Sequence, residues 1–508
     1  MKSFRIKNIK SFADSKEIDI KPITIFVGRN SCGKSSLIRF PAVLAQTANA
    51  ESDSPIKFYG KMVDYGNYED VIHYGATEKM SFDLKYTINV SITNNRHSID
   101  YFLKTIMGEK IDEEKKKDFR DIILRITLDK PEKRLSVEKL ELYLEDKCLY
   151  FICRTDNQKY TFYVNYIYEN GEFIEKPYYM DIDRVGFEKF VPRYDFTDAL
   201  RSIYNVTFES KISEEKIEEL SKIIGMKNES EDGLSDDDMK ILSIWKQFEY
   251  YSDLTRDFFR KYTNEAHNIR YIGPFRADPE RIYRDPEYIS YGVGVHGEHT
   301  SNELIRDFRR KDAKLIANIS KWTKEILGCE IVLKEVTTGM FQIMLKNAKE
   351  VETNLIDNGY GISQVLPIVT EVVRLTAASF DKEYAMEIDD KMLILEQPEL
   401  HLHPAAQSEL ADLFVNCILT SEGKKKILIE THSEHLIRKL QVLIASKECG
   451  LTNEMVRIYY VDKDDNGEAF VEEMKILENG KFETAWPSGF FDKGYLLSRE
   501  LARAGIQD

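Results

Sequence analysis

The 508-residue sequence has few cysteines, no long apolar run and no excess of basic residues. Its six cysteines show no paired metal-ligand spacing, which argues against a cysteine-bound zinc site and fits a reducing compartment. No stretch approaches the roughly 18 apolar residues of a membrane span, and the start lacks the apolar core of a signal peptide. We therefore expect a soluble, cytoplasmic protein without a membrane partner.

The charge balance is acidic, with 87 Asp and Glu residues against 72 Lys and Arg residues and a formal net charge of −15. A chain with this charge is not a general polyanion binder, so contact with DNA or RNA requires a local basic face. The best candidate for such a face contains Arg306, Arg309, Arg310 and Lys311. The alternative, which we favour, is an ordinary solvated helix face.

A phosphate-binding loop is the clearest motif. The apolar run at residues 24–27 is typical of a buried strand and leads into Gly28-Arg29-Asn30-Ser31-Cys32-Gly33-Lys34-Ser35. This segment matches the pattern G-x-x-x-x-G-K-[ST] at every fixed position, which predicts ATP and Mg²⁺ as cofactors. Lys34 can reach the β- and γ-phosphates, and the Ser35 hydroxyl can bind Mg²⁺. The residues expected to bind ATP here are Gly28, Asn30, Gly33, Lys34, Ser35 and Ser36.

Three further elements follow more than three hundred residues later. A polar, glycine-containing turn at residues 357–364 opens an apolar helix, which is typical of an anion-binding helix start. The apolar run at residues 392–395 predicts a strand that ends in Glu396, a carboxylate suited to holding Mg²⁺ through water. A second strand, at residues 426–430, precedes His432, which either reaches a γ-phosphate or caps the next helix.

The order of these motifs resembles that of ABC-type ATPases. More closely, the chain resembles the OLD-like (overcoming lysogenization defect) AAA ATPases without a Toprim nuclease domain, including the PtuA subunits of Septu and some retron antiphage systems. The blocks that carry the resemblance are Gly28–Ser35, Tyr271–Arg276, Gly359–Gln364, Glu396–Pro404, Glu430–Ser433 and Trp486–Asp492.

This resemblance implies an α/β fold, with an ABC-type ATPase head built from a phosphate-loop α/β core and an antiparallel β subdomain. It also implies that the chain forms a dimer or higher homo-oligomer around ATP. The signature turn of one protomer would then contact the nucleotide of the other through Gly359, Gly361, Ser363 and Gln364. A partner effector, such as an HNH nuclease in antiphage defence, is implied as well.

One residue departs from the family pattern. Where the family has a catalytic glutamate after Glu396, this chain has Gln397, which has no carboxylate to accept a proton. A glutamine can still orient water, but loss of a general base typically costs about 10²–10⁴-fold in rate. We therefore expect tight ATP binding with slow hydrolysis. The expected catalytic residues are Glu396, Gln397, Glu399 and His432, and the expected metal-binding residues are Ser35 and Glu396.

The rest of the chain suggests four parts. Residues 1–90 begin the head, residues 91–265 form a β-rich and then helical insertion, residues 266–455 complete the head, and residues 456–508 form a hairpin and tail. Alternating residues in the β-rich part predict an antiparallel sheet with one wet face. The segment from Asp462 to Glu473 matches the EF-hand pattern, but its flanks look like strands, which favours a hairpin.

Two other functions remain open. The first is a DNA-repair or chromosome-associated ATPase that clamps DNA, which salt-sensitive duplex binding would favour. The second is a nucleotide-sensing scaffold with negligible hydrolysis, which ATP retention without turnover would favour.

Overall fold

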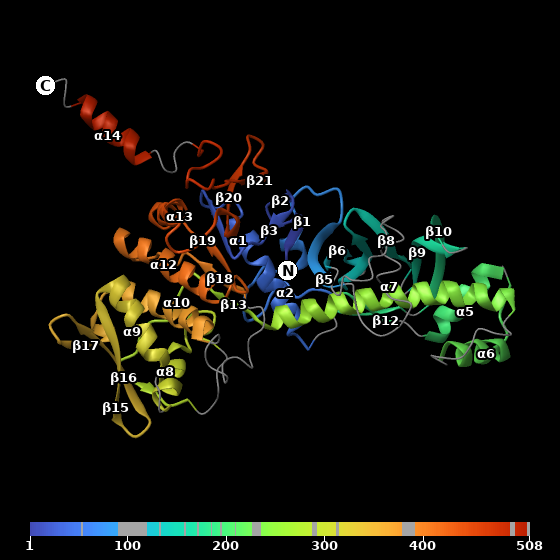
Figure 1. Cartoon of the computed structure of the whole chain (residues 1–508), viewed down its shortest axis with the longest axis horizontal. Coiled ribbons are helices and arrows are strands. Elements are labelled where there is room, and N and C mark those ends of the chain that lie inside the picture. Colours follow the sequence, from blue (N-terminus) through green and yellow to red (C-terminus); the bar gives the residue numbers. More distant parts are fainter. Residues whose placement is uncertain are drawn as a thin grey trace. The chain divides into compact units, whose positions relative to one another are not determined.

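The computed structural model divides into two compact units, each assembled from separate segments of the chain (Figure 1). The sheet unit consists of Met1–Ile18, Thr47–Phe58 and Tyr65–Asn264, and the head unit of Asp19–Gln46, Tyr59–Asp64 and Glu265–Asp508. The four-part division expected from the sequence stays a prediction. The structure describes residues 1–51, 54–89, 119–131, 134–156, 159–169, 172–183, 185–193, 196–208, 210–225, 235–286, 292–310, 314–377, 392–487 and 493–504.

A mainly parallel sheet forms the centre of the head unit. Its order is β13-β18-β19-β4-β20-β21, and all neighbours are parallel except the terminal hairpin of β20 and β21. The hairpin confirms the interpretation that rejected an EF-hand. The strands are β13 (Ile269–Ile272), β18 (Met392–Glu396), β19 (Lys426–Glu430), β4 (Ile23–Gly28), β20 (Val456–Lys463) and β21 (Ala469–Glu473).

The register of this sheet positions the site. Every residue of β4 is buried, as expected for a parallel strand covered on both faces. Glu396 of β18 lies opposite Glu430 of β19, and Glu430 lies opposite Phe26 of β4. Two carboxylates therefore reach the edge of the sheet where β4 enters the phosphate loop.

Helices of the head unit pack on this sheet and share one hydrophobic core with it. Alternate strand residues such as Ile25, Leu395 and Ile429 are fully buried in that core, together with Val369 and Leu410 from two of the helices. The helices that contribute to this core are α8 (Thr300–Phe308), α9 (Lys314–Leu327), α10 (Tyr360–Ala377), α12 (Pro404–Thr420) and α13 (Glu434–Ser446). The unit also contains α1 (Lys34–Ile38), α2 (Phe40–Ala48), α14 (Lys493–Ala504) and the 3-10 turns η2 (Leu355–Asp357) and η3 (Asn453–Met455).

The head unit also contains a small antiparallel sheet. Its order is β14-β16-β15, and β17 pairs with β16. These strands are β14 (Tyr283–Arg284), β15 (Cys329–Thr337), β16 (Met340–Asn347) and β17 (Glu352–Asn354). Its buried residues, among them Leu333 and Phe341, join the same core as the parallel sheet.

A long antiparallel sheet dominates the sheet unit. Its order is β10-β9-β8-β7-β6-β5-β1-β2, with β3 paired to β1, and all neighbours along the main path are antiparallel. The strands are β1 (Ser3–Ile9), β2 (Phe12–Asp14), β3 (Ile18–Asp19), β5 (Met80–Asn89), β6 (Phe119–Asp129), β7 (Ser136–Leu144), β8 (Lys147–Asp156), β9 (Lys159–Glu169) and β10 (Glu172–Asp183).

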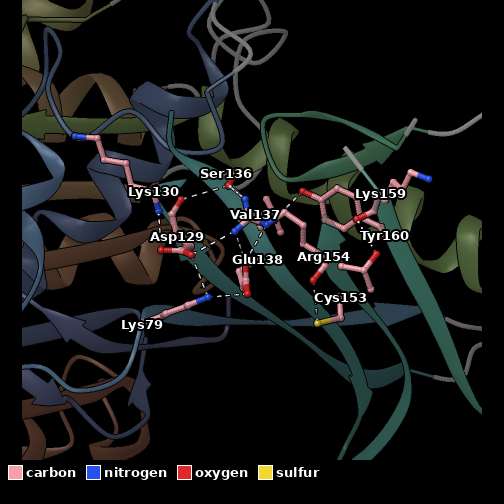
Figure 2. A network of polar contacts seen from close by, with 11 residues as sticks. Lys79, Asp129, Lys130, Ser136, Val137, Glu138, Cys153, Arg154, Lys159 and Tyr160 are labelled. Atoms are coloured by element: carbon pink, nitrogen blue, oxygen red, sulfur yellow. Dashed lines mark hydrogen bonds and ion pairs between the residues drawn. The ribbon is translucent and has the colours of Figure 1, made fainter. Parts of the chain in front are cut away.

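One face of this sheet is polar and partly exposed. Figure 2 shows the network there, in which Lys79 contacts Asp129 at 3.0 Å and Glu138 at 2.6 Å. Arg154 pairs with the same two carboxylates, at 3.3 Å and 2.6 Å. The alternation in β6, where Leu124 and residues of the same parity are buried, places apolar side chains on the other face. The predicted antiparallel sheet with one wet face is therefore confirmed.

A long helix, α7 (Asp236–His267), packs aromatic side chains on the apolar face. Phe258 contacts Tyr86 with ring centroids 5.0 Å apart, and Phe248 contacts Phe162 at 5.5 Å. The remaining elements of the unit are α3 (Tyr68–Val71), β11 (Gly186–Glu188), β12 (Val191–Arg193), α5 (Phe196–Phe208) and α6 (Glu214–Gly225). The predicted α/β fold class, with a parallel core and antiparallel sheets, is thus confirmed. Among the helices that the structure describes, none has the length and apolar character needed to cross a bilayer.

Candidate functional site

The phosphate loop connects β4 to α1 and turns through left-handed backbone. Gly28 and Gly33 have φ of 143° and 104°, and a Cβ on Gly28 would lie 1.9 Å from the carbonyl oxygen of Val461 in β20. Only glycine fits such an approach. Asn30 lies at the exposed crest of the loop, whereas Ser36 is half-buried and its N–H donates to Gly33 O at 3.0 Å.

Lys34 points back into the loop. Its Nζ donates to the carbonyl oxygens of Gly28 at 3.1 Å and of Arg29 at 2.6 Å, and the side chain is 3% exposed. Burial lowers the pKa of Lys34, while Glu430 at 4.0 Å opposes that change. An ammonium held this way is positioned for an anion that enters the loop.

Ser35 contacts an acidic residue at the end of the neighbouring strand. Its hydroxyl donates to Glu430 Oε2 at 2.8 Å. Burial, followed by the charge of Glu396, raises the pKa of Glu430. Ser35 and Glu430 are 395 positions apart and meet because β19 pairs directly with β4.

Glu396 is held in a different way. Arg39 grips it with Nε at 2.5 Å from Oε1 and Nη2 at 2.7 Å from Oε2. The Tyr271 hydroxyl donates to Oε1 at 2.8 Å, and Arg276 donates to the Glu396 backbone oxygen at 2.6 Å. Burial lowers the pKa of Arg276 to about 10 and raises that of Tyr271. Both oxygens of the Glu396 carboxylate therefore have strong donors.

Gln397 follows Glu396 in a left-handed conformation, with φ of 46°. Its backbone N–H donates to Glu430 O at 2.7 Å, and the residue is half-buried. Such a conformation is uncommon outside glycine and asparagine and is often found at functional positions.

The buried Glu399 contacts the backbone of the half-buried His432. Glu399 Oε1 accepts from the N–H of His432 at 2.7 Å, and burial raises the pKa of Glu399. Burial, aided by the charge of Lys34, lowers the pKa of His432, which favours the neutral imidazole. Glu399 Oε2 and His432 Nε2 are buried without a hydrogen bond of normal geometry to any described residue. Polar atoms left open in this way fit a site that takes a polar ligand.

The signature turn lies at the start of α10. No described residue lies within 4 Å of a Cβ built on Gly359, whereas a Cβ on Gly361 would lie 2.7 Å from the backbone oxygen of His401. Ser363 and Gln364 are buried within the chain, and the Ser363 hydroxyl donates to Tyr360 O at 2.9 Å. Contact of these four residues with the nucleotide of a second chain stays a prediction.

The structure thus gathers the phosphate loop, Glu396, Gln397, Glu399 and His432 at one edge of the parallel sheet. Five residues to which the sequence assigned no firm role also lie at this edge. They are Arg39, Tyr271, Arg276, Glu430 and Asp462. Arg39 carried a weak signal, since it lies four residues after Ser35. Asp462 carried none, because only the pairing of β20 with β4 brings it to Cys32 at 3.3 Å.

The donor set can be compared with the needs of Mg²⁺. Within the described residues no group of three or more His, Cys, Asp or Glu side chains could hold a metal ion. Mg²⁺ usually keeps several waters and takes one or two carboxylates together with substrate phosphates. Ser35 with a neighbouring carboxylate fits this pattern, whereas a metal site independent of nucleotide does not.

Comparison with known families covers most of the chain. Residues 1–437 match the family described as AAA ATPase domain, and residues 451–494 match a family described as a protein of unknown function (DUF3696). No protein with a curated description matches the sequence.

Among solved structures, three SMC heads are weakly similar to this chain. The SMC head bound to the C-winged helix domain of ScpA is 12% identical over 93% of this chain and 97% of that chain, with a TM-score of 0.38. The head domain from Thermotoga maritima is 9% identical over 94% and 99%, with a TM-score of 0.36. The coiled-coil-extended head from Pyrococcus furiosus, bound to the C-terminal domain of ScpA, is 13% identical over 99% of both chains, with a TM-score of 0.37. Likenesses this weak carry no inference about function or assembly.

Proposed function

Because this chain belongs to the AAA ATPase domain family, we propose that it binds ATP with Mg²⁺ at the phosphate loop and hydrolyses the nucleotide slowly. The observation that carries the proposal is the Lys34 ammonium, which is buried inside the loop, 4.0 Å from the Glu430 carboxylate that accepts a hydrogen bond from Ser35. The residues proposed to bind the phosphates are Gly28, Asn30, Gly33, Lys34, Ser35 and Ser36.

The chemistry that the chain itself supplies is mostly electrostatic. Bound Mg²⁺ would neutralise phosphate charge and polarise the phosphoryl group. Lys34 would donate hydrogen bonds to the bound anion, and the neutral His432 would offer Nε2 to a polar group of the ligand. Gln397 can orient a water molecule but cannot take its proton. Glu399 is held by the backbone of His432, so we propose that it positions this turn.

The finer proposal is that ATP controls assembly and a partner. Following the resemblance to OLD-like ATPases of antiphage systems, we propose that the chain forms homo-oligomers around ATP and regulates an effector nuclease of the HNH type. The open surroundings of Gly359 and the exposed Tyr360 support a contact to a second chain.

A DNA clamp receives less support. Two arginines of the proposed basic face are already paired, Arg306 with Glu303 at 2.5 Å and Arg309 with Asp285 at 2.7 Å. Pairing within the chain weakens their attraction for phosphates. Lys311 lies outside the described residues.

Equilibrium binding of ATP with Mg²⁺, followed by steady-state hydrolysis, tests the proposal. We expect the unmodified chain to bind ATP tightly and to hydrolyse it slowly. The rate of hydrolysis should also change when Gln397 is replaced by alanine. Rapid turnover that Gln397→Ala leaves unchanged would overturn the idea that this position limits the rate. Co-expression with an HNH nuclease encoded beside the gene tests the partner, and salt-sensitive duplex binding without such a partner would favour the DNA clamp.

A further inference from the structure

Two buried carboxylates at the edge of the parallel sheet are candidates for holding a divalent cation. Glu396 ends β18 and Glu430 ends β19, and the two residues are paired in register. Both side chains are nearly inaccessible, at 3% and 5% exposed. Their polar partners differ, and this difference indicates which of them is free to hold a divalent cation.

Glu396 already has its positive partner. Arg39 bridges both of its oxygens with a bidentate pair, and Tyr271 donates to one of them. Paired guanidinium and carboxylate groups form strong, directional contacts. To bind a cation directly, Glu396 would have to give up its contacts with Arg39, which is unfavourable because the carboxylate is buried.

Glu430 is held less strongly than Glu396 and lies next to Ser35, the other expected ligand of the cation. Ser35 donates a hydrogen bond to Glu430 at 2.8 Å and Lys34 forms an ion pair with it at 4.0 Å, while the charges of Glu396 and Arg39 also act on it. Adjacent oxygens of an octahedral Mg²⁺ complex, each about 2.0–2.1 Å from the metal, lie roughly 2.9 Å apart. The 2.8 Å between the oxygens of Ser35 and Glu430 is a hydrogen-bond distance and is also compatible with two neighbouring Mg²⁺ ligands.

We propose that Glu430, rather than Glu396, is the protein carboxylate that holds the nucleotide-bound divalent cation together with Ser35. Arg39 keeps Glu396 in a structural ion pair that shapes the same edge. This inference rests on the proposed ATP-binding function.

Electron paramagnetic resonance of Mn²⁺ tests the inference on the full chain. The cation is titrated into protein saturated with a non-hydrolysable ATP analogue, for the unmodified chain, Glu430→Gln and Glu396→Gln. We expect Glu430→Gln to weaken Mn²⁺ binding at least about tenfold, which is about 1.4 kcal/mol. Glu396→Gln should weaken it by less than about threefold. The opposite ranking would overturn the inference.

Two further measurements keep the result interpretable. Affinity for the analogue in excess EDTA should be equal for the unmodified chain and Glu430→Gln, because the carboxylate acts on the nucleotide through the cation. Glu430→Asp should recover part of the Mn²⁺ affinity, and Glu303→Gln, which alters a buried acid of the head unit outside the site, should retain it. A chain that binds the analogue but loses no Mn²⁺ affinity in Glu430→Gln would refute only this inference. Failure of the unmodified chain to bind the analogue would refute the proposed function as well.

Discussion

Glu399 and Glu430 in the head unit are held in the opposite way to the acids on the wet face of the antiparallel sheet. Burial raises the pKa of Glu399 and of Glu430 at the edge of the parallel sheet. On the wet face of the antiparallel sheet, burial also acts to raise the pKa of Asp129 and of Asp121, but hydrogen bonds from lysines outweigh it and the net pKa is lowered. Asp129 and Asp121 have lysine partners within the chain. Glu399 and Glu430 have raised pKa values, which are typical of a ligand-binding site.

The largest expected difference concerns two lysines. Lys34→Met removes a buried ammonium from the phosphate loop, whereas Lys79→Met removes one that is 43% exposed in the sheet network. Hydrogen bonds to charged groups are worth about 1.5–3 kcal/mol each, so losing two should weaken ATP binding by roughly 100-fold or more. Lys79→Met should leave affinity unchanged. Calorimetric titration with ATP measures the affinity of both variants. Equal losses of affinity would show that Lys34 has no special role in binding ATP.

The second prediction concerns two arginine pairs. Arg39→Gln leaves Glu396 buried without its guanidinium partner and should cost about 3–5 kcal/mol of unfolding free energy. Arg154→Gln, in the partly exposed network of Figure 2, should cost only about 1 kcal/mol, because water can reach Asp129 and Glu138. Chemical denaturation measures both losses. Adding Glu396→Gln to Arg39→Gln should recover much of the first loss, and no recovery would argue against a buried charge as its cause.

The smallest expected effect is the dependence of stability on pH. The lowered pKa of Asp129 contributes stability above its ordinary value of 3.8, and this contribution is lost as the pH falls through the lowered folded value. The raised pKa of Glu399 has the opposite sign, because protonation of the folded state begins above 4.5 and adds stability as the pH falls.

Thermal unfolding between pH 7 and pH 3 checks these signs. At pH 7, Asp129→Asn should be less stable than the unmodified chain, and Glu399→Gln should be equally or more stable. Both differences in stability from the unmodified chain should become smaller as the pH falls. The difference for Glu399→Gln should do so at a higher pH than the difference for Asp129→Asn. A destabilised Glu399→Gln at pH 7 would show that this acid is as well satisfied as those of the sheet.

Much of the parallel core could be predicted from the sequence, because its elements are local. The phosphate loop, the strands ending in Glu396 and Glu430, and the hairpin after β20 each follow from a short pattern of residues. The wet and apolar faces of the antiparallel sheet followed from alternation in strands such as β6.

The partners within the site could not be predicted in the same way. Contact between Ser35 and Glu430 depends on the strand order β18-β19-β4, which no local pattern reveals. Tyr271 reaches Glu396 only because β13 pairs with β18. A glutamate at the end of a strand looks the same in sequence whether an arginine or a serine faces it.

The rate of ATP hydrolysis by Gln397→Glu shows whether the site lacks only a general base. If the site is a complete ATP frame that lacks only a general base, restoring the carboxylate should raise steady-state hydrolysis by about 10²-fold or more, with ATP affinity little changed. If Gln397→Glu binds ATP but hydrolyses it no faster than the unmodified chain, the missing carboxylate at this position does not limit hydrolysis.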